Sequence, residues 1–295
     1  MTADTEDLID ITQHPTLDAA FRERARRSTD KTAYIQYDAD QERWLAHSWA
    51  DTAREVARWQ TALQGAGLRA GDRVGIMMHN RWEWVIFDQA ALGLGLVTVP
   101  LYPNDRHDNI AHVLEDSGTR LLFLQNQDQW EELRPIDELL GSLVAVVTLN
   151  PLDTGSTRAR VVASADWLPD QPRELQSLCT DPQALFTIIY TSGTTGKPKG
   201  VMLSHHNVLT NAAAALSVVN MFADDRLLSF LPLSHALERT AGYYLNILSG
   251  SAVAYARSIP QLGEDLLEIK PTVLVSVPRI FERVNTKVQA KLAQD

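Results

Sequence analysis

Residues 190–201 read Tyr190-Thr191-Ser192-Gly193-Thr194-Thr195-Gly196-Lys197-Pro198-Lys199-Gly200-Val201, with apolar runs at 185–189 and 201–203 on either side. The twelve residues hold three glycines, two lysines and four Ser or Thr hydroxyls. Glycine lets the backbone approach a ligand closely, and successive N–H groups can form a concave nest for phosphate oxygens. Hydroxyl and ammonium groups add donors and positive charge. The stretch therefore predicts a loop between two buried strands that grips a triphosphate.

Two other interpretations compete for this loop. The P-loop pattern GxxxxGK[ST] fails, because Pro198 follows Lys197 and Thr191 stands where the first glycine belongs. Residues 201–203 also favour a strand over an immediate helix, so the helix-dipole contribution of a P-loop is not expected. A Gly/Thr/Ser linker explains the composition equally well. The flanking strands and the two closely spaced lysines favour the phosphate loop over the linker.

Length, composition and charge describe an ordinary soluble globular protein. The chain has 295 residues, which corresponds to about two domains or one large one. It is 45% hydrophobic and 22% charged. Its net charge of −10 argues against a nucleic-acid partner, which needs a basic stripe. Cys179 is the only cysteine, so an internal disulfide and a Cys-based metal site are excluded and a cytoplasmic setting is expected.

No segment has the character of a signal peptide or a membrane span. The first thirteen residues carry four acidic side chains and no basic one, unlike a signal peptide. The most apolar long stretch, residues 90–103, is shorter than the roughly 20 residues that a spanning helix needs. We therefore expect no transmembrane segment, while peripheral contact with a membrane remains compatible with the sequence.

Alternating strand-like and helix-like segments predict an α/β fold with layered, mostly parallel sheets flanked by helices. Thr16, Ser48 and Ser204 are placed to cap helices that run to about residues 27, 66 and 219. The other expected strands are 32–37, 43–47, 72–78, 96–99, 121–124, 143–149, 226–230, 252–256 and 272–276. The other expected helices are 82–94, 108–116, 130–140, 236–248, 262–269 and 279–293.

The irregular, proline-containing stretch before the loop suggests a boundary between two parts of the chain. We expect an acidic tail over residues 1–14, an N-terminal α/β subdomain over 15–180, and a second α/β subdomain over 181–295 that carries the phosphate loop.

Tyr190–Gly200 resembles the signature loop of the AMP-forming acyl-CoA synthetases, the superfamily that includes firefly luciferase and nonribosomal-peptide adenylation domains. The usual form of that loop is [YF]TSGTTGxPKG, and this chain fills every position with Lys197 in the variable slot. The resemblance extends over nearly the whole chain, and it identifies the fold as the N-terminal part of the large domain of an adenylate-forming enzyme. The further blocks that carry it are 71–74, 80–84, 99–103, 200–205 and 230–235. Three more blocks, 236–239, 270–272 and 277–279, are similar to the long-chain fatty acyl branch.

The resemblance implies a reaction in two halves. A fatty acid carboxylate attacks the α-phosphate of ATP and gives acyl-AMP, and the thiol of coenzyme A then displaces AMP. The residues implied as phosphate contacts are Thr191, Ser192, Gly193, Thr194, Thr195, Gly196 and Lys199. Thr191 is also the implied contact for Mg²⁺. Lys199 is preferred over Lys197 because the family pattern fixes only Lys199.

His235 is the second implied catalytic residue. Taken alone, it is better explained as a helix-start histidine with a structural hydrogen bond. With the family pattern, it lies beside the acyl carboxylate and the α-phosphate and orients or stabilises the carboxylate. Glu238 and Arg239 are interpreted as markers of the long-chain branch, and as a charged pair on a helix surface rather than catalysts.

Several other residues are weighed as structural. His205 and His206 are adjacent, so on a helix they diverge by about 100° and do not share one metal site. An acyl tunnel is expected among the apolar helices after His235, although each candidate taken singly is better explained as core. Those candidates are Tyr243, Tyr244, Leu245 and Leu248; Trp82 and Trp84 are likewise expected in the core.

The later motifs of the resembled family have no counterpart in this chain. Those motifs are a YGxTE-like segment, a ribose-binding aspartate, a hinge and a C-terminal lid domain with a catalytic lysine. We therefore expect residues 1–295 to be an N-terminal portion that is inactive alone. Two alternatives remain open: an acyl-AMP ligase that loads a carrier protein, and a noncatalytic, truncated nucleotide-binding relative. The expected partners are small molecules, namely ATP, a long-chain fatty acid and CoA, and the sequence does not decide the oligomeric state.

Overall fold

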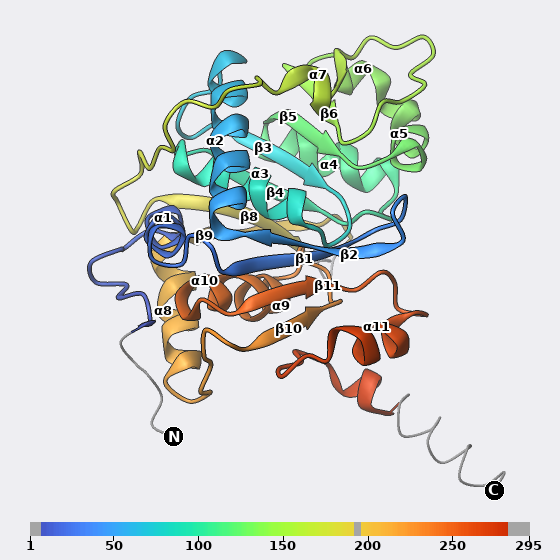
Figure 1. Cartoon of the computed structure of the whole chain (residues 1–295). Coiled ribbons are helices and arrows are strands. Elements are labelled where there is room, and N and C mark those ends of the chain that lie inside the picture. Colours follow the sequence, from blue (N-terminus) through green and yellow to red (C-terminus); the bar gives the residue numbers. More distant parts are fainter. Residues whose placement is uncertain (1–6, 192–195, 283–295) are drawn as a thin grey trace, which may run out of the picture.

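The computed structural model describes residues 7–191 and 196–282, which form two β-sheets with helices packed on them (Figure 1). The larger sheet has the strand order β7-β6-β5-β3-β4-β8-β9, and the smaller has the order β10-β11-β1-β2. The strands are β1 (Thr32–Asp38), β2 (Arg43–Ser48), β3 (Arg73–Met77), β4 (Val97–Leu101), β5 (Thr119–Leu124), β6 (Ala145–Thr148), β7 (Val161–Ala163), β8 (Leu185–Thr191), β9 (Lys199–Ser204), β10 (Arg226–Ser229) and β11 (Ala252–Tyr255).

Most neighbouring strands run parallel, as the strand–helix alternation predicts. The exceptions are the hairpin β1–β2 and the pair β8–β9, which are antiparallel. The longer helices are α1 (Leu17–Arg27), α2 (Trp49–Gly65), α3 (Trp82–Gly93), α4 (His107–Ser117), α5 (Gln127–Leu133), α8 (His205–Leu216) and α11 (Leu262–Ile269). The shorter ones are η2 (Arg134–Ile136), α6 (Asp137–Leu140), α7 (Ser164–Trp167), α9 (Ala236–Arg239), η3 (Thr240–Tyr244) and α10 (Leu245–Ser249). The α/β fold class is confirmed.

The elements stack in five layers, because both sheets are covered on both faces. Along β5, Leu121 and Phe123 join the core shared with the smaller sheet, whereas Leu122 and Leu124 face the opposite side. Helices α1, α2, α3, α8 and α10 contribute to the shared core between the sheets. Helices α4, α5 and α6 cover the outer face of the larger sheet, and α11 covers the outer face of the smaller one.

Each sheet combines strands from both sides of residue 180. The hairpin β1–β2 pairs through β1 with β11, and β8 pairs with β4. In Figure 1 the larger sheet occupies the upper half and the smaller one lies below it, with blue and orange strands side by side in the smaller sheet. Neither sheet belongs to one side of residue 180 alone, and the boundary expected there stays a prediction.

The expected helix caps are present. The Thr16 hydroxyl accepts a hydrogen bond from the Ala19 N–H, and Ser48 forms a reciprocal capping box with Asp51. Ser204 caps α8 in the same way with Asn207. However, α8 ends at Leu216 rather than at residue 219, because Ser and β-branched Val side chains follow, and these favour the helix less than alanine does.

Two expected elements after residue 235 differ from the structure. The single helix expected over 236–248 is divided into α9, the π-helical turn η3 and α10. The strand expected over 272–276 is reduced to one parallel bridge between Val273 and Leu227 at the edge of the smaller sheet. Most of the helix expected over 279–293 lies outside the described residues.

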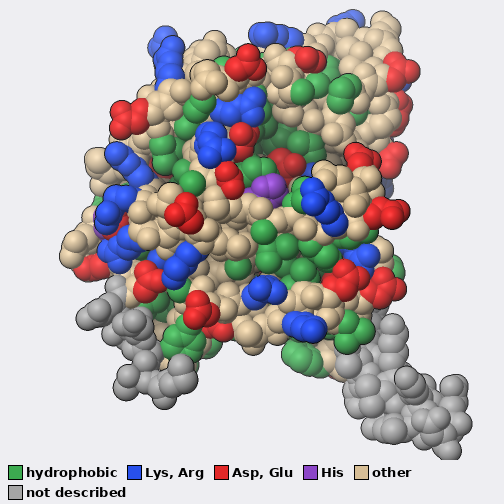
Figure 2. Space-filling model, in the orientation of Figure 1, with side chains coloured by type: hydrophobic (Ala, Val, Ile, Leu, Met, Phe, Trp, Pro, Cys, Tyr) green, Lys and Arg blue, Asp and Glu red, His purple; other side chains and the backbone are tan. Residues whose placement is uncertain are grey.

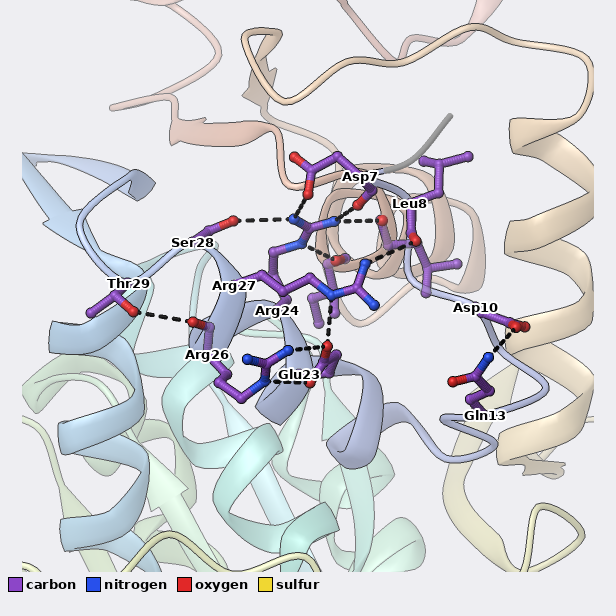
Figure 3. A network of polar contacts seen from close by, with 12 residues as sticks. Asp7, Leu8, Asp10, Gln13, Glu23, Arg24, Arg26, Arg27, Ser28 and Thr29 are labelled. Atoms are coloured by element: carbon purple, nitrogen blue, oxygen red, sulfur yellow. Dashed lines mark hydrogen bonds and ion pairs between the residues drawn. The ribbon is translucent and has the colours of Figure 1, made fainter. Parts of the chain in front are cut away.

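The described part of the expected acidic tail, residues 7–14, is attached to the fold rather than loose. Ile9 is buried, and its N–H donates to the carbonyl of Leu248 at the end of α10. The buried guanidinium of Arg24 pairs with the Asp7 carboxylate and donates to the carbonyls of Ile247 and Leu248 (Figure 3). Arg24 thereby satisfies carbonyl groups that the end of a helix leaves without partners.

The surface agrees with the composition. On the face drawn in Figure 2, the Lys and Arg side chains of the described residues are interspersed with Asp and Glu and form no continuous basic stripe. Within residues 7–191 and 196–282, no helix is both long enough and apolar enough to cross a bilayer.

Gly250 provides a test of the contact between Arg24 and α10. Its φ is +79°, and a Cβ at this position would lie 2.8 Å from Nη1 of Arg24. Gly250→Ala should therefore lower the free energy of unfolding by about 2 kcal/mol, measured by urea unfolding. The matched control is Gly67→Ala after α2, where φ is +78° and the added methyl meets open space, so it brings the same backbone strain without a contact to Arg24 and should cost only about 1 kcal/mol. Equal effects of the two substitutions would contradict the contact.

Candidate functional site

The phosphate loop connects two antiparallel strands at the edge of the larger sheet. Thr191 at the end of β8 pairs with Lys199 at the start of β9, so the loop begins and ends at neighbouring backbone positions. Strand β9 follows directly, which confirms that a strand rather than a helix succeeds the loop. Gly196 has a φ of +119°, a conformation that a side chain disfavours. Four of the implied phosphate contacts, Ser192, Gly193, Thr194 and Thr195, lie outside the described residues.

The position of the loop suits ligand binding. Strand β8 is parallel to β4, so the loop lies beyond the carboxyl ends of the parallel strands. Ligands of open α/β sheets bind at this edge. Thr191, Gly196 and Lys199 are all exposed there. The hydroxyl of Thr191 and the ammonium group of Lys199 are therefore available to an anion at the mouth of the loop.

Gly200 lets the base of the hairpin close tightly. A Cβ at residue 200 would lie 2.7 Å from Cγ2 of Ile188 and 3.1 Å from the ring of Tyr190. The first distance is shorter than real Cβ contacts and the second is tight, so close approach rather than φ favours glycine here. The ring of Tyr190 can consequently lie directly against β9.

His235 stands at the start of α9 and is exposed. Its Nδ1 accepts a hydrogen bond from the N–H of Leu237 at 3.2 Å. This bond confirms the structural hydrogen bond expected of a helix-start histidine. It also places the proton of the neutral ring on Nε2, which leaves an N–H donor directed away from the helix.

Asn80 holds the segment that leads to His235. This residue follows β3 at the carboxyl edge of the larger sheet. Its side-chain NH₂ donates to the carbonyl of Leu231 at 2.6 Å and to the hydroxyl of Ser229 at 2.9 Å. Its carbonyl oxygen accepts from the N–H of Leu233 at 2.9 Å. Sequence reasoning assigned Asn80 no role, and a polar side chain directly after a buried strand was the available signal.

Glu238 and Arg239 are buried, which corrects their interpretation as a charged pair on a helix surface. Each is 1% exposed. Arg239 forms an ion pair with the buried Asp88 of α3. Glu238 and Arg239 have separate partners in the interior: Glu238 accepts from Ser229, and Arg239 pairs with Asp88.

Arg239 joins the His235 helix to the strand that carries the loop. Its guanidinium donates to the hydroxyl of Thr187 on β8 at 2.7 Å and to that of Thr98 on β4 at 2.8 Å. Thr187 lies four residues before Thr191, and Arg239 lies four residues after His235. The structure therefore brings the two implied catalytic regions into one framework through residues that sequence reasoning treated as markers.

Two tunnel candidates belong to this same network. The hydroxyls of Tyr243 and Tyr244 donate to Asp88 at 3.1 and 2.9 Å. Leu245 and Leu248 are buried in the core between the sheets. The interpretation of these four residues as core is therefore favoured over a role in lining an acyl site.

Several expectations about structural residues are confirmed. Trp84 is buried in the core, and Trp82 is partly buried, with its indole N–H donating to Thr52 at 3.1 Å.

His205 is buried, and its Nδ1 accepts from the N–H of Leu17 at the start of α1. Burial lowers the pKa of His205 to about 4. His206 is exposed, so the two histidines do not converge.

Glu238 has an unusual environment for a carboxyl group. Its Oε1 accepts a hydrogen bond from the Ser229 hydroxyl at 2.6 Å, and its Oε2 is buried with no partner among the described residues. Burial raises the pKa of Glu238 to about 7. Gly242 in η3 lies so close that a Cβ there would be 2.3 Å from Oε1, so any larger residue would displace the carboxyl group.

The raised pKa predicts a pH-dependent stability. The unfolded chain releases the Glu238 proton near its ordinary pKa of 4.5, whereas the folded protein keeps it up to about 7. Between these values the folded state binds more protons, so its stability falls as pH rises. Glu238→Gln should remove this fall, which amounts to at most about 3 kcal/mol.

The measurement is urea unfolding of wild type and Glu238→Gln between pH 4.5 and 8. His205 acts in the opposite direction below its ordinary pKa of 6.5, so the difference between the two proteins, rather than either curve, isolates Glu238. Glu174→Gln on the exposed surface is the control. A difference that does not change with pH would refute the buried, protonated carboxyl group.

Comparison with known proteins places the chain among sequences of one family. The family model described as AMP-binding enzyme matches residues 21–295. A long-chain-fatty-acid–CoA ligase of Mycobacterium tuberculosis, FadD15, is 35% identical over 260 residues, which are 83% of this chain and 41% of the ligase. Long chain acyl-CoA synthetase 1 of Arabidopsis thaliana is 32% identical over 263 residues, 85% of this chain and 40% of that protein. The chain thus spans about two fifths of the length of these relatives.

Solved structures show the same fold. The anthranilate CoA ligase AuaEII, in complex with anthranoyl-AMP, matches 90% of this chain and 51% of its own with a TM-score of 0.78 and 20% identity. ATP-bound MatB from Rhodopseudomonas palustris matches 92% of this chain and 50% of its own with a TM-score of 0.76 and 22% identity.

Proposed function

Because this chain belongs to the AMP-binding enzyme family, we propose that it is the N-terminal portion of a long-chain fatty acid–CoA ligase. One observation carries the proposal. The hairpin loop fills every position of [YF]TSGTTGxPKG and opens at the carboxyl edge of the larger sheet, between Thr191 and Lys199. The relatives named above suggest the substrate class, since one is a long-chain-fatty-acid–CoA ligase and the other a long chain acyl-CoA synthetase.

The first half-reaction makes acyl-AMP. An oxygen of the fatty acid carboxylate bonds to the α-phosphorus of ATP, and the bond from that phosphorus to the bridging oxygen breaks, so pyrophosphate leaves with the electron pair. Negative charge grows on the leaving group, and fixed donors and cations stabilise it. The proposed contacts to the β- and γ-phosphates are Thr191, Ser192, Gly193, Thr194, Thr195, Gly196 and Lys199.

His235 is proposed to act on the other reactant. The N–H at Nε2 can donate to a carboxylate oxygen and hold the acid in line with the α-phosphate, because Nδ1 is already occupied by the Leu237 N–H. In the second half-reaction the CoA thiol loses its proton to solvent, its sulfur bonds to the acyl carbon, and the bond from that carbon to the phosphate oxygen breaks, so AMP leaves with the electron pair. A thiol on a carrier protein could accept the acyl group by the same chemistry. The similarity to a CoA ligase and an acyl-CoA synthetase favours CoA.

We propose that a magnesium ion arrives with ATP and that Thr191 contacts it. Among the described residues there is no group of three His, Cys, Asp or Glu side chains that could hold a metal. Mg²⁺ commonly binds through few protein oxygens together with substrate phosphates. Thr191 is the proposed protein contact, and the ion would neutralise charge on the phosphate oxygens. We further propose a cytoplasmic protein, with peripheral membrane contact compatible with its lipid substrate.

The two loop lysines provide a matched test. Lys199→Ala should lower kcat/KM for adenylation by about 100-fold or more, because it removes a cation from the leaving pyrophosphate. Lys197→Ala, in the variable position of the same loop, should have an effect at least ten times smaller. The assay is pyrophosphate release from ATP and a long-chain fatty acid by the longest protein that the gene encodes. Equal losses in the two variants would count against the assignment of Lys199.

A second test concerns the isolated chain. We propose that residues 1–295 alone do not turn over, because they span about two fifths of the relatives' length. Purified 1–295 with ATP, Mg²⁺ and a long-chain fatty acid should release no pyrophosphate above the rate without acid. Robust acid-dependent release would show that this part of the fold suffices for adenylation.

A further inference from the structure

Strand β8 has a short paired register with its parallel neighbour β4 before it reaches the loop. The parallel register between β4 and β8 is formed by Thr98 and Thr187. From Ile188 to Thr191, β8 pairs with β9 alone. A two-stranded ribbon is only marginally stable by itself. In this ribbon Ile189 and Tyr190 are buried, whereas the terminal residues Thr191 and Lys199 are exposed, so further contacts are needed to fix the ends of the loop.

Helix α4 supplies contacts at both ends of the loop. The hydroxyl of Tyr190 donates to Oδ2 of Asp116 at 2.6 Å, directly before Thr191. Nε2 of His112 lies 3.0 Å from the carbonyl oxygen of Pro198, directly before Lys199. A carbonyl oxygen only accepts, so Nε2 of His112 carries a proton and donates. One helix thus bonds the chain where it enters the loop and where it leaves it.

The two helix residues are arranged for this purpose. His112 and Asp116 are four residues apart in α4, so they lie on one face of the helix. The ring of Tyr190 packs into the core beneath α4. It meets the imidazole ring of His112 edge to face, and the two ring centroids are 6.4 Å apart. Gly200 leaves room for that ring on the other side. Burial and the neighbouring Asp116 carboxylate raise the pKa of Tyr190, which keeps its hydroxyl a donor.

We propose that His112 and Asp116 are positioning residues, which fix both ends of the phosphate loop on α4 so that Thr191 and Lys199 meet the β- and γ-phosphates in a productive arrangement. The proposal rests on the proposed adenylation activity. Small displacements of a positioned group can cost a large factor in rate. Release of either end should therefore impair the step that uses the triphosphate and spare the step that does not.

The test compares the two half-reactions in the longest protein that the gene encodes. Asp116→Leu, Tyr190→Phe and His112→Leu each remove one bond of the α4 contacts; leucine is used at 116 because the amide oxygen of asparagine would still accept from Tyr190. Each should lower kcat/KM for ATP in pyrophosphate release about 10- to 100-fold. The conversion of supplied acyl-AMP and CoA to acyl-CoA, which involves no β- or γ-phosphate, should change less than threefold.

Three controls sharpen the comparison. Glu115→Gln removes a carboxylate from an exposed position of the same helix and should leave both half-reactions unchanged. His112→Gln keeps an N–H donor at the end of a side chain of similar length and should restore most of the activity that His112→Leu loses. The double variant Asp116→Leu with Tyr190→Phe should be no worse than the poorer single variant, because both remove the same bond.

Each outcome decides one of the two proposals. If the unaltered protein releases no pyrophosphate with any fatty acid, the proposed function fails. If it is active and the variants at positions 112, 116 and 190 behave like Glu115→Gln, the positioning role is wrong. Equal losses in both half-reactions would show that these residues act on general folding, and that result would also overturn the positioning role.

Discussion

Arg239 and Asp88 form an ion pair in the interior of the protein, on helices α9 and α3. Two charges buried without each other would be costly, since removal of one partner of such a pair typically destabilises a protein by about 3–5 kcal/mol. Thr98, Thr187 and Tyr244 complete the hydrogen bonds of the guanidinium. These contacts hold α9, α3, β4 and β8 in fixed positions relative to one another. Because His235 starts α9 and β8 leads into the phosphate loop, the same contacts fix where His235 lies relative to the loop.

Much of the fold could be predicted because its signals are local. Alternating strands and helices give an α/β fold, and hydroxyl residues at 16, 48 and 204 mark helix starts. The loop is also local, since its glycines, hydroxyls and lysines are contiguous and lie between two apolar runs. Even the absence of a helix directly after Gly200 could be inferred from residues 201–203, which form β9.

The interior polar network could not be predicted, because its members lie far apart in the sequence. Arg239 is 151 residues from Asp88, and Asp116 is 74 residues from Tyr190. A charged pair on a short helix is normally exposed, and nothing within residues 236–239 distinguishes a buried Arg from an exposed one. The π-helical turn η3 escaped prediction for a related reason. It passes over the Glu238 carboxyl group at Gly242, and this constraint is visible only in three dimensions.

The same contacts bear on how the chain can be divided. Asn80, Asp88 and Asp116 precede residue 180, whereas their partners Leu231, Arg239 and Tyr190 follow it. Both sheets also cross that position. If the parts before and after residue 180 were separated, each sheet would expose a strand edge, and Asp88 and Arg239 would lose their counter-charges. The loop and His235 are therefore better regarded as parts of one folded framework, in which the N-terminal segment supplies the acceptors and donors that hold the later segment in place.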